Sequence, residues 1–287
     1  MTQWSPVPPM VLSSRANRLF SVPTLARVAR EAGTQGLDLD LAGRAVTLAG
    51  LSSGPEPGPD LIGQIAAVWL PLNRPPRMAG HRVDHQLNDW IRLTLDAGAR
   101  RVVVDREAAL RPLGEQDKRP LLLRLQDALG AAASVTVVLR PAQLEGTRAH
   151  LATLGALRRT AEEWDFDLAL DLLGTVDPRW EAEAALQRLG SRLSLVRLPV
   201  PHDVPATAGR SRLTSRTVSY LLDQSYAGTL SLVPRLPWTG LFSVAVLERR
   251  TRDATSSVVE RHQRIFAPAR TPTWLSARPE RQDQRLG

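Results

Sequence analysis

The sequence predicts an α/β protein, a (β/α)8 barrel in which eight short strands alternate with helices. Short apolar runs alternate with stretches of helical periodicity over about 250 residues, the usual length of this fold. Several runs are apolar throughout, as strands buried on both faces require. No GxGxxG turn follows a predicted strand, which disfavours an open doubly wound sheet, the main alternative.

The predicted strands are rich in Val, Leu and Ile and are each about four to seven residues long. They cover residues 10–14, 36–41, 65–70, 101–105, 135–139, 166–171, 193–198 and 229–233. A parallel barrel brings the carboxyl ends of all its strands to one mouth. We therefore expect any functional site where these runs pass into the following loops.

Helical patterns separate most of the strands. The first, residues 22–32, opens with Ser21 as N-cap and Pro23 in its first turn, and it stops at Gly33. The others cover residues 84–97, 120–129, 147–164, 178–189, 211–222, 241–247 and 256–266. The segment 49–60, rich in Gly, Pro and Ser, predicts a loop instead. These patterns predict a barrel over residues 1–250, then an additional C-terminal helix and a loose basic tail over 251–287.

Composition excludes several classes of protein. The 287 residues are 43% hydrophobic and 23% charged, which is globular composition. The chain has no cysteine, so disulfides, thiolate zinc sites, iron–sulfur clusters and a cysteine nucleophile are excluded. No apolar run approaches the roughly 20 residues of a membrane helix, and the N-terminus does not read as a secretory signal. We expect a cytoplasmic protein without a membrane partner.

Positive charge gathers at the C-terminal end. The formal net charge is +8, and Lys118 is the single lysine among 37 basic residues. Residues 249–287 carry nine arginines and four acids. Such a tail is a weak electrostatic footprint for nucleic acid. Docking of nucleic acid or a protein partner through the tail is therefore a minor hypothesis.

Two features resemble the sugar phosphate isomerase/epimerase superfamily, also called xylose-isomerase-like barrels. The segment SVPTLARVAREAGTQGLDLDL, residues 21–41, resembles that family's opening helix, A-x-x-A-G turn and second strand. The order and spacing of the last four strands resemble it as well. The resemblance covers residues 7–250 and implies a barrel that binds sugars or sugar phosphates at its mouth.

Enzymes of that family hold a divalent metal through a Glu, an Asp followed by a His, a His, and a Glu on the fifth to eighth strands. This chain keeps the Asp as Asp171, but Gly174 stands where the following His is expected. Arg140, Arg197 and Val233 stand at the other positions. Guanidinium groups repel a dication, and one carboxylate cannot hold it against them. The resemblance therefore implies a divergent member with a degenerate metal site, and we expect no metal and no cofactor.

Arginines follow most of the predicted strands and form the candidate ligand-binding set. The set is Arg74, Arg106, Arg140, Arg197 and Arg235, together with Trp238 in the loop after the eighth strand. If these guanidinium groups converge, they would bind phosphate or carboxylate. The alternative is that each pairs with a nearby acid: Asp40, Asp105, Glu107 or Asp171.

The candidate catalytic residues are Asp171, Asp40 and His85. Asp38 and Asp40 alternate with leucines, which places both on one face of the second strand. Asp40 is nearer the mouth and could act as a base, although pairing with an arginine is the alternative. His81 and His85 are four residues apart, so a helix would present both on one face, but HExxH is not completed.

Two main functions follow. The first is a pseudoenzyme that has lost metal-dependent catalysis and binds a phosphorylated or carboxylated small molecule. The second is an active sugar phosphate isomerase or epimerase that uses Asp40, Asp171 and His85 as acids and bases.

Overall fold

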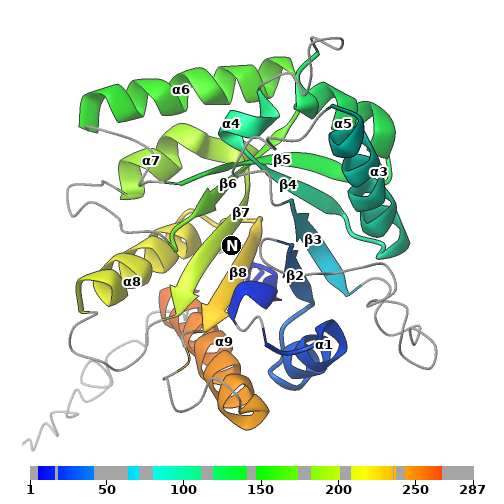
Figure 1. Cartoon of the computed structure of the whole chain (residues 1–287). Coiled ribbons are helices and arrows are strands. Elements are labelled where there is room, and N and C mark those ends of the chain that lie inside the picture. The colour runs from blue at the N-terminus through cyan, green and yellow to red at the C-terminus, as the bar shows by residue number, and fades with distance from the viewer. Residues whose placement is uncertain are drawn as a thin grey trace, which may run out of the picture.

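The computed structural model is a closed barrel of parallel strands, joined side by side in the order β1 to β8 (Figure 1). It describes residues 6–16, 19–41, 64–70, 80–110, 119–140, 147–173, 182–200, 208–234, 236 and 243–266. The predicted (β/α)8 barrel is therefore confirmed. The loop predicted over residues 49–60 and the loose tail predicted after residue 266 lie outside the described residues.

All eight strands lie within about two residues of their predicted bounds. They are β1 (Met10–Ser13), β2 (Leu37–Asp40), β3 (Ile65–Trp69), β4 (Arg101–Asp105), β5 (Ser134–Leu139), β6 (Asp167–Asp171), β7 (Leu193–Val200) and β8 (Thr229–Pro234). The strand that extends furthest beyond its predicted end is β7, by two residues. It continues through Pro199, which pairs in register with Val233 of β8.

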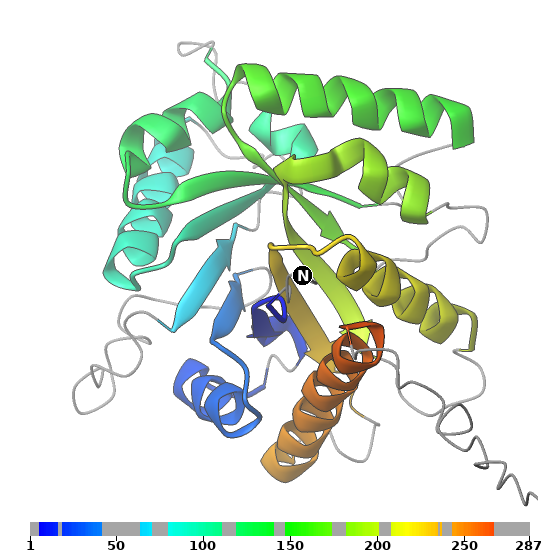
Figure 2. The ribbon, with the colours of Figure 1, turned by 180° about the vertical axis from the view of Figure 1, so that it is seen from behind.

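Helices surround the barrel in both views (Figures 1 and 2). Within the described residues they are α1 (Val22–Glu31), α3 (Gly80–Asp96), α4 (Arg106–Ala109), α5 (Leu121–Leu129), α6 (Thr147–Glu163), α7 (Ala182–Leu189), α8 (Ala208–Asp223) and α9 (Val244–Phe266), with the 3-10 turns η1 (Ser14–Ala16) and η3 (Gly190–Arg192). No helix in this part of the chain is both long and apolar enough to span a bilayer.

The ends of α1 are the predicted ones. The hydroxyl of Ser21 accepts a hydrogen bond from the backbone N–H of Thr24 at 3.3 Å, and Pro23 lies in the first turn. Gly33 follows the helix with φ +75°, a left-handed conformation that favours glycine. This compact end turns the chain directly into β2.

The predicted break between two C-terminal helices is wrong, because residues 244–266 form the single helix α9. Residues 244–247 and 256–266 are helical as predicted. Thr251 and Thr255 lie on its buried face, and their hydroxyls donate to the carbonyls of Leu247 and Thr251 at 2.8 and 2.9 Å. These bonds let polar residues occupy a buried helix face. The apolar periodicity of a helix is therefore interrupted at these positions in the sequence. Helix α9 packs on β8, α1 and α8, and a division at residue 250 would fall inside it.

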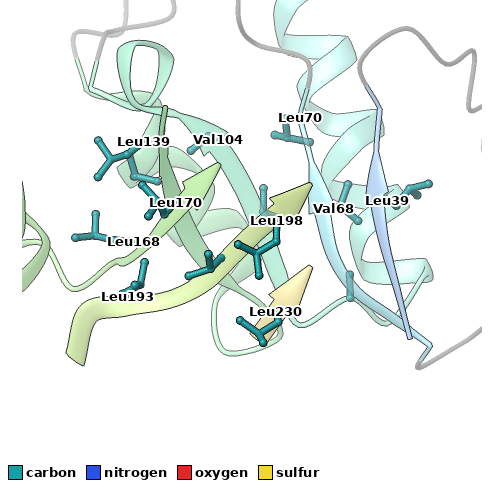
Figure 3. Close-up of a cluster of buried hydrophobic side chains, with 14 of the residues drawn as sticks. Leu39, Val68, Leu70, Val104, Leu139, Leu168, Leu170, Leu193, Leu198 and Leu230 are labelled. Carbon is teal, nitrogen blue, oxygen red and sulfur yellow. The ribbon is translucent and has the colours of Figure 1, made fainter. Parts of the chain in front are cut away.

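The strands bury two different faces. Their outward residues pack beneath the helices in one apolar core, part of which Figure 3 shows. The labelled members include Leu39, Val68, Leu139, Leu170 and Leu198. The inward residues fill the barrel. A smaller apolar cluster occupies one part of the interior, and charged groups occupy the rest. The candidate site lies among these charged groups.

Candidate functional site

The second strand places two carboxylates inside the barrel. In β2, Leu37 and Leu39 face the helices, so Asp38 and Asp40 face inward. The backbone N–H of Asp40 donates to the hydroxyl of Ser14, at 2.8 Å. The prediction that both aspartates share one face of the strand is confirmed. The two carboxylates are buried and need a cation nearby.

That cation is the guanidinium of Arg197 on β7. Its Nη2 donates to both carboxylate oxygens of Asp38 at 3.1 Å, and its Nε donates to Oδ2 at 3.3 Å. Its Nη1 donates to Asp40 Oδ2 at 3.0 Å and lies 3.8 Å from Asp171 Oδ2. The side chain of Arg197 is 0% exposed. Three carboxylates from two strands therefore converge on one buried guanidinium.

Two further interior side chains complete its surroundings. The Cζ of Arg197 lies 3.2 Å from the centre of the Trp69 ring, in a cation–π contact. The hydroxyl of Ser231 on β8 donates to Asp38. The guanidinium is thus held at its edge by carboxylates and on its face by an aromatic ring.

A second arginine extends the network toward the mouth. Arg140, the residue after β5, pairs with Asp105 at the end of β4 and lies 3.5 Å from Asp171 Oδ2 through its Nε. Both aspartates also accept from backbone N–H groups. Asp105 accepts from Glu107 at 3.1 Å and so caps α4, and Asp171 accepts from Leu173 at 3.1 Å. These bonds hold the carboxylates in fixed positions.

A third arginine ends the network on the opposite side. Arg15, in the turn after β1, lies 3.3 Å from Asp40 Oδ2. Its side chain is 33% exposed and that of Arg140 is 20% exposed, whereas Arg197 between them is fully buried. Arginines and aspartates therefore alternate across the barrel, and its outer members reach solvent at the carboxyl end of the strands.

Burial and neighbouring charges shift the pKa of two members of the network, Asp38 and Arg197. Burial raises the pKa of Asp38 from 3.8 to about 6, against the opposing effects of Arg197 and Ser231. Burial alone would lower the pKa of Arg197, but the surrounding aspartates outweigh it and raise that pKa above its ordinary value. Arg197 is therefore charged at any physiological pH.

These residues do not fit the dication that the family resemblance implies. Asp171 ends β6 as that resemblance requires, but Arg140 and Arg197 both lie within 4 Å of it. A dication there would meet two positive groups. Among the described residues, no three His, Asp or Glu side chains are arranged to hold a metal ion.

The structure brings together part of the predicted site. Asp40, Asp171, Arg140 and Arg197 meet in the barrel, and the arginines are paired with acids, the alternative that the sequence left open. Arg106 opens α4 and takes part in none of the ion pairs between described residues. Arg74, Arg235, Trp238 and the side chain of His85 lie outside the described residues.

Asp105, named from the sequence as a possible partner of an arginine, does pair with Arg140. Three members of the site were missed: Arg15, Trp69 and Ser231. A usable signal existed for each. Arg15 follows the first strand as closely as the other candidate arginines follow theirs. Trp69 and Ser231 occupy inward positions in the alternation of β3 and β8.

Comparison with solved structures gives the fold a family context. A xylose isomerase domain containing protein from Salmonella typhimurium is 13% identical, with TM-score 0.57, over 88% of this chain and 98% of that one. D-psicose 3-epimerase from Clostridium cellulolyticum, solved with D-tagatose, is 11% identical, with TM-score 0.55, over 88% of this chain and 99% of that one. The IolI protein, solved with a zinc atom, is 10% identical, with TM-score 0.51, over 91% and 100%.

At these identities the likeness shows the fold alone: the chain shares the (β/α)8 barrel fold of these proteins. No family model matches the chain, and no curated protein matches it.

Proposed function

We propose that this barrel works without a metal and binds an anionic small molecule, phosphorylated or carboxylated, at the carboxyl end of its strands. One observation carries the proposal. The guanidinium of Arg197 is hydrogen-bonded to Asp38 and Asp40, so the interior carboxylates already hold a cation that belongs to the chain. The proposal therefore makes the protein a relative of sugar isomerases that has lost metal-dependent catalysis.

Arg140 and Arg15 are the proposed contacts for the ligand. Both guanidinium groups lie at the carboxyl end of the strands and keep exposed surface. Their aspartates fix their position, and a guanidinium carries five N–H donors, so a paired arginine can still bind an oxyanion. Arg197 has no exposed surface and supports this face from below.

The proposal is tested by thermal shift of the full chain. Mn²⁺ or Mg²⁺ should leave the Tm unchanged, and EDTA should have no effect. A screen of sugar phosphates and carboxylates should find a ligand that raises the Tm, by about 5 °C at one hundred times its Kd. Arg140→Ala should abolish that shift, while Arg158→Ala, on the outer helix α6, should not. Stabilisation by Mn²⁺ that Asp171→Ala removes would refute the proposal.

An active isomerase or epimerase is the second candidate, and the raised pKa of Asp38 favours it. A carboxyl with a pKa of about 6 can exchange protons near neutral pH. Two observations weigh against it: Asp38 is fully buried, and Asp40 and Asp171 are ion-paired. Exchange of substrate carbon-bound hydrogen with deuterated water, lost in Asp171→Asn, would favour this candidate over the first.

A further inference from the structure

The surroundings of the Arg197 guanidinium have the form of a ligand site. Asp38 binds two of its nitrogens in a fork, at 3.1 and 3.3 Å. Asp40 binds the third nitrogen at 3.0 Å. Forked carboxylates are the geometry that proteins use to select a planar guanidinium over a spherical cation.

The face of the group is recognised as well. Trp69 lies 3.2 Å from its central carbon. Aromatic faces attract cations, and they do so most strongly where water is excluded. Trp69 is 3% exposed, so the contact is a dry one. Edge and face together match the shape and the charge of a guanidinium.

The cage is built without the help of Arg197. Ser231 on β8 donates to the Asp38 carboxylate, and Arg15 in η1 lies 3.3 Å from the Asp40 carboxylate, whose backbone N–H donates to Ser14. Groups outside β7 therefore hold both aspartates. The Arg197 side chain supplies the cation and a covalent tether. A tether raises the effective concentration of a bound group but adds no contact to its recognition.

We infer that the barrel interior is a guanidinium-selective cation site, formed by Asp38, Asp40, Asp171 and Trp69, which the chain fills with its own Arg197. If the tether is cut, the site will take a free guanidinium ion from solution. This inference deepens the metal-independent site proposed above, because it states which cation replaces the metal.

The experiment uses the full chain with Arg197→Ala, which leaves the buried carboxylates without their cation. We expect its Tm to fall by about 10 °C relative to wild type. Guanidinium chloride at about 20 mM, far below denaturing concentrations, should then raise the variant's Tm by about 3 °C or more. Urea has the same shape without the charge, and NaCl has charge without the shape. Neither should raise it, and wild type should respond to none of the three.

A second pair of variants localises the effect. Arg197→Ala combined with Asp38→Asn should lose the rescue, because the fork is gone. Arg197→Ala combined with Asp40→Asn keeps the Asp38 fork and has one uncompensated negative charge fewer, so guanidinium should raise its Tm. This double variant replaces the single variant in the experiment if the single variant does not fold. The inference is overturned if guanidinium acts on these variants as urea does, or if Asp38→Asn leaves the rescue intact. A failed anion screen on wild type would refute the proposed ligand but would not change this result.

Discussion

The two faces of the same strands are built on different rules. The outward face of β2 carries Leu37 and Leu39 into one continuous apolar core, whereas its inward face carries Asp38 and Asp40 into an ion-pair network. The outer face is stabilised by burial of apolar surface, and such packing tolerates exchange between side chains of similar size. The inner face is stabilised by specific partners, because a buried charge without its counter-ion is strongly destabilising. Alternation along one strand therefore separates packing from chemistry.

The largest loss of stability is expected when the ion-pair network of the inner face is disrupted. Arg197→Met keeps the bulk of the side chain but leaves Asp38, Asp40 and Asp171 without their buried cation. We expect a loss of about 3–5 kcal/mol in the free energy of unfolding, measured by urea denaturation. A loss below about 1 kcal/mol would mean that the network adds little to the fold.

The corresponding substitution on the outer face removes apolar packing. Leu39→Ala removes a fully buried side chain from the apolar core, and we expect a loss of about 3 kcal/mol. Leu19→Ala is the control, because Leu19 is 61% exposed and should change stability by less than about 0.5 kcal/mol. Leu39→Ala should also leave any ligand affinity unchanged. A loss of affinity as large as that in Arg140→Ala would contradict the separation of the two faces.

The two faces were not equally readable from the sequence. Outward residues repeat at the period of a strand, so local pattern alone predicted all eight strands. The inner network joins residues far apart in the chain: Arg197 and Asp38 are 159 positions apart. No local pattern records such a pair. Alternation in LDLD predicted which face Asp38 and Asp40 share, but it could not identify their partner.

Two particular residues show why the depth of the site was missed. The predicted seventh strand ends at Leu198, one residue before Pro199, and proline cannot donate a hydrogen bond to a neighbouring strand. In the structure β7 continues to Val200, so Arg197 lies inside the barrel instead of near its mouth. Arg15 was not predicted, although it follows the first strand as directly as Arg140 follows the fifth.

The pH dependence of stability is expected to distinguish the inner face as well. The pKa of Asp38 is about 6 in the folded protein and 3.8 as its ordinary value, so protonation favours the folded state. Its contribution to stability is complete below about pH 4 and is lost as the pH rises through 6. The Asp38→Asn variant cannot ionise at this position, so it does not lose this stability as the pH rises. The stability of the variant relative to wild type should therefore rise by about 2 kcal/mol between about pH 4 and pH 7, measured by urea denaturation. A flat or falling difference would show that Asp38 is held as an anion.

The smallest expected effect comes from an ion pair outside both faces. Arg158 and Glu162 lie 2.8 Å apart on α6, and the Arg158 side chain is 40% exposed. Arg158→Ala should lower the free energy of unfolding by less than about 1 kcal/mol, and added salt should shrink the difference. A loss comparable to that of Arg197→Met would mean that burial does not distinguish the two arginines.

Crystals grown with MnCl2 offer the most direct test of what occupies the barrel interior. An anomalous difference map should contain no manganese peak among Asp38, Asp40 and Asp171, and the density there should be that of the Arg197 guanidinium. A manganese peak bonded to Asp171, with the Arg197 side chain displaced, would contradict the conclusion that the chain supplies its own cation.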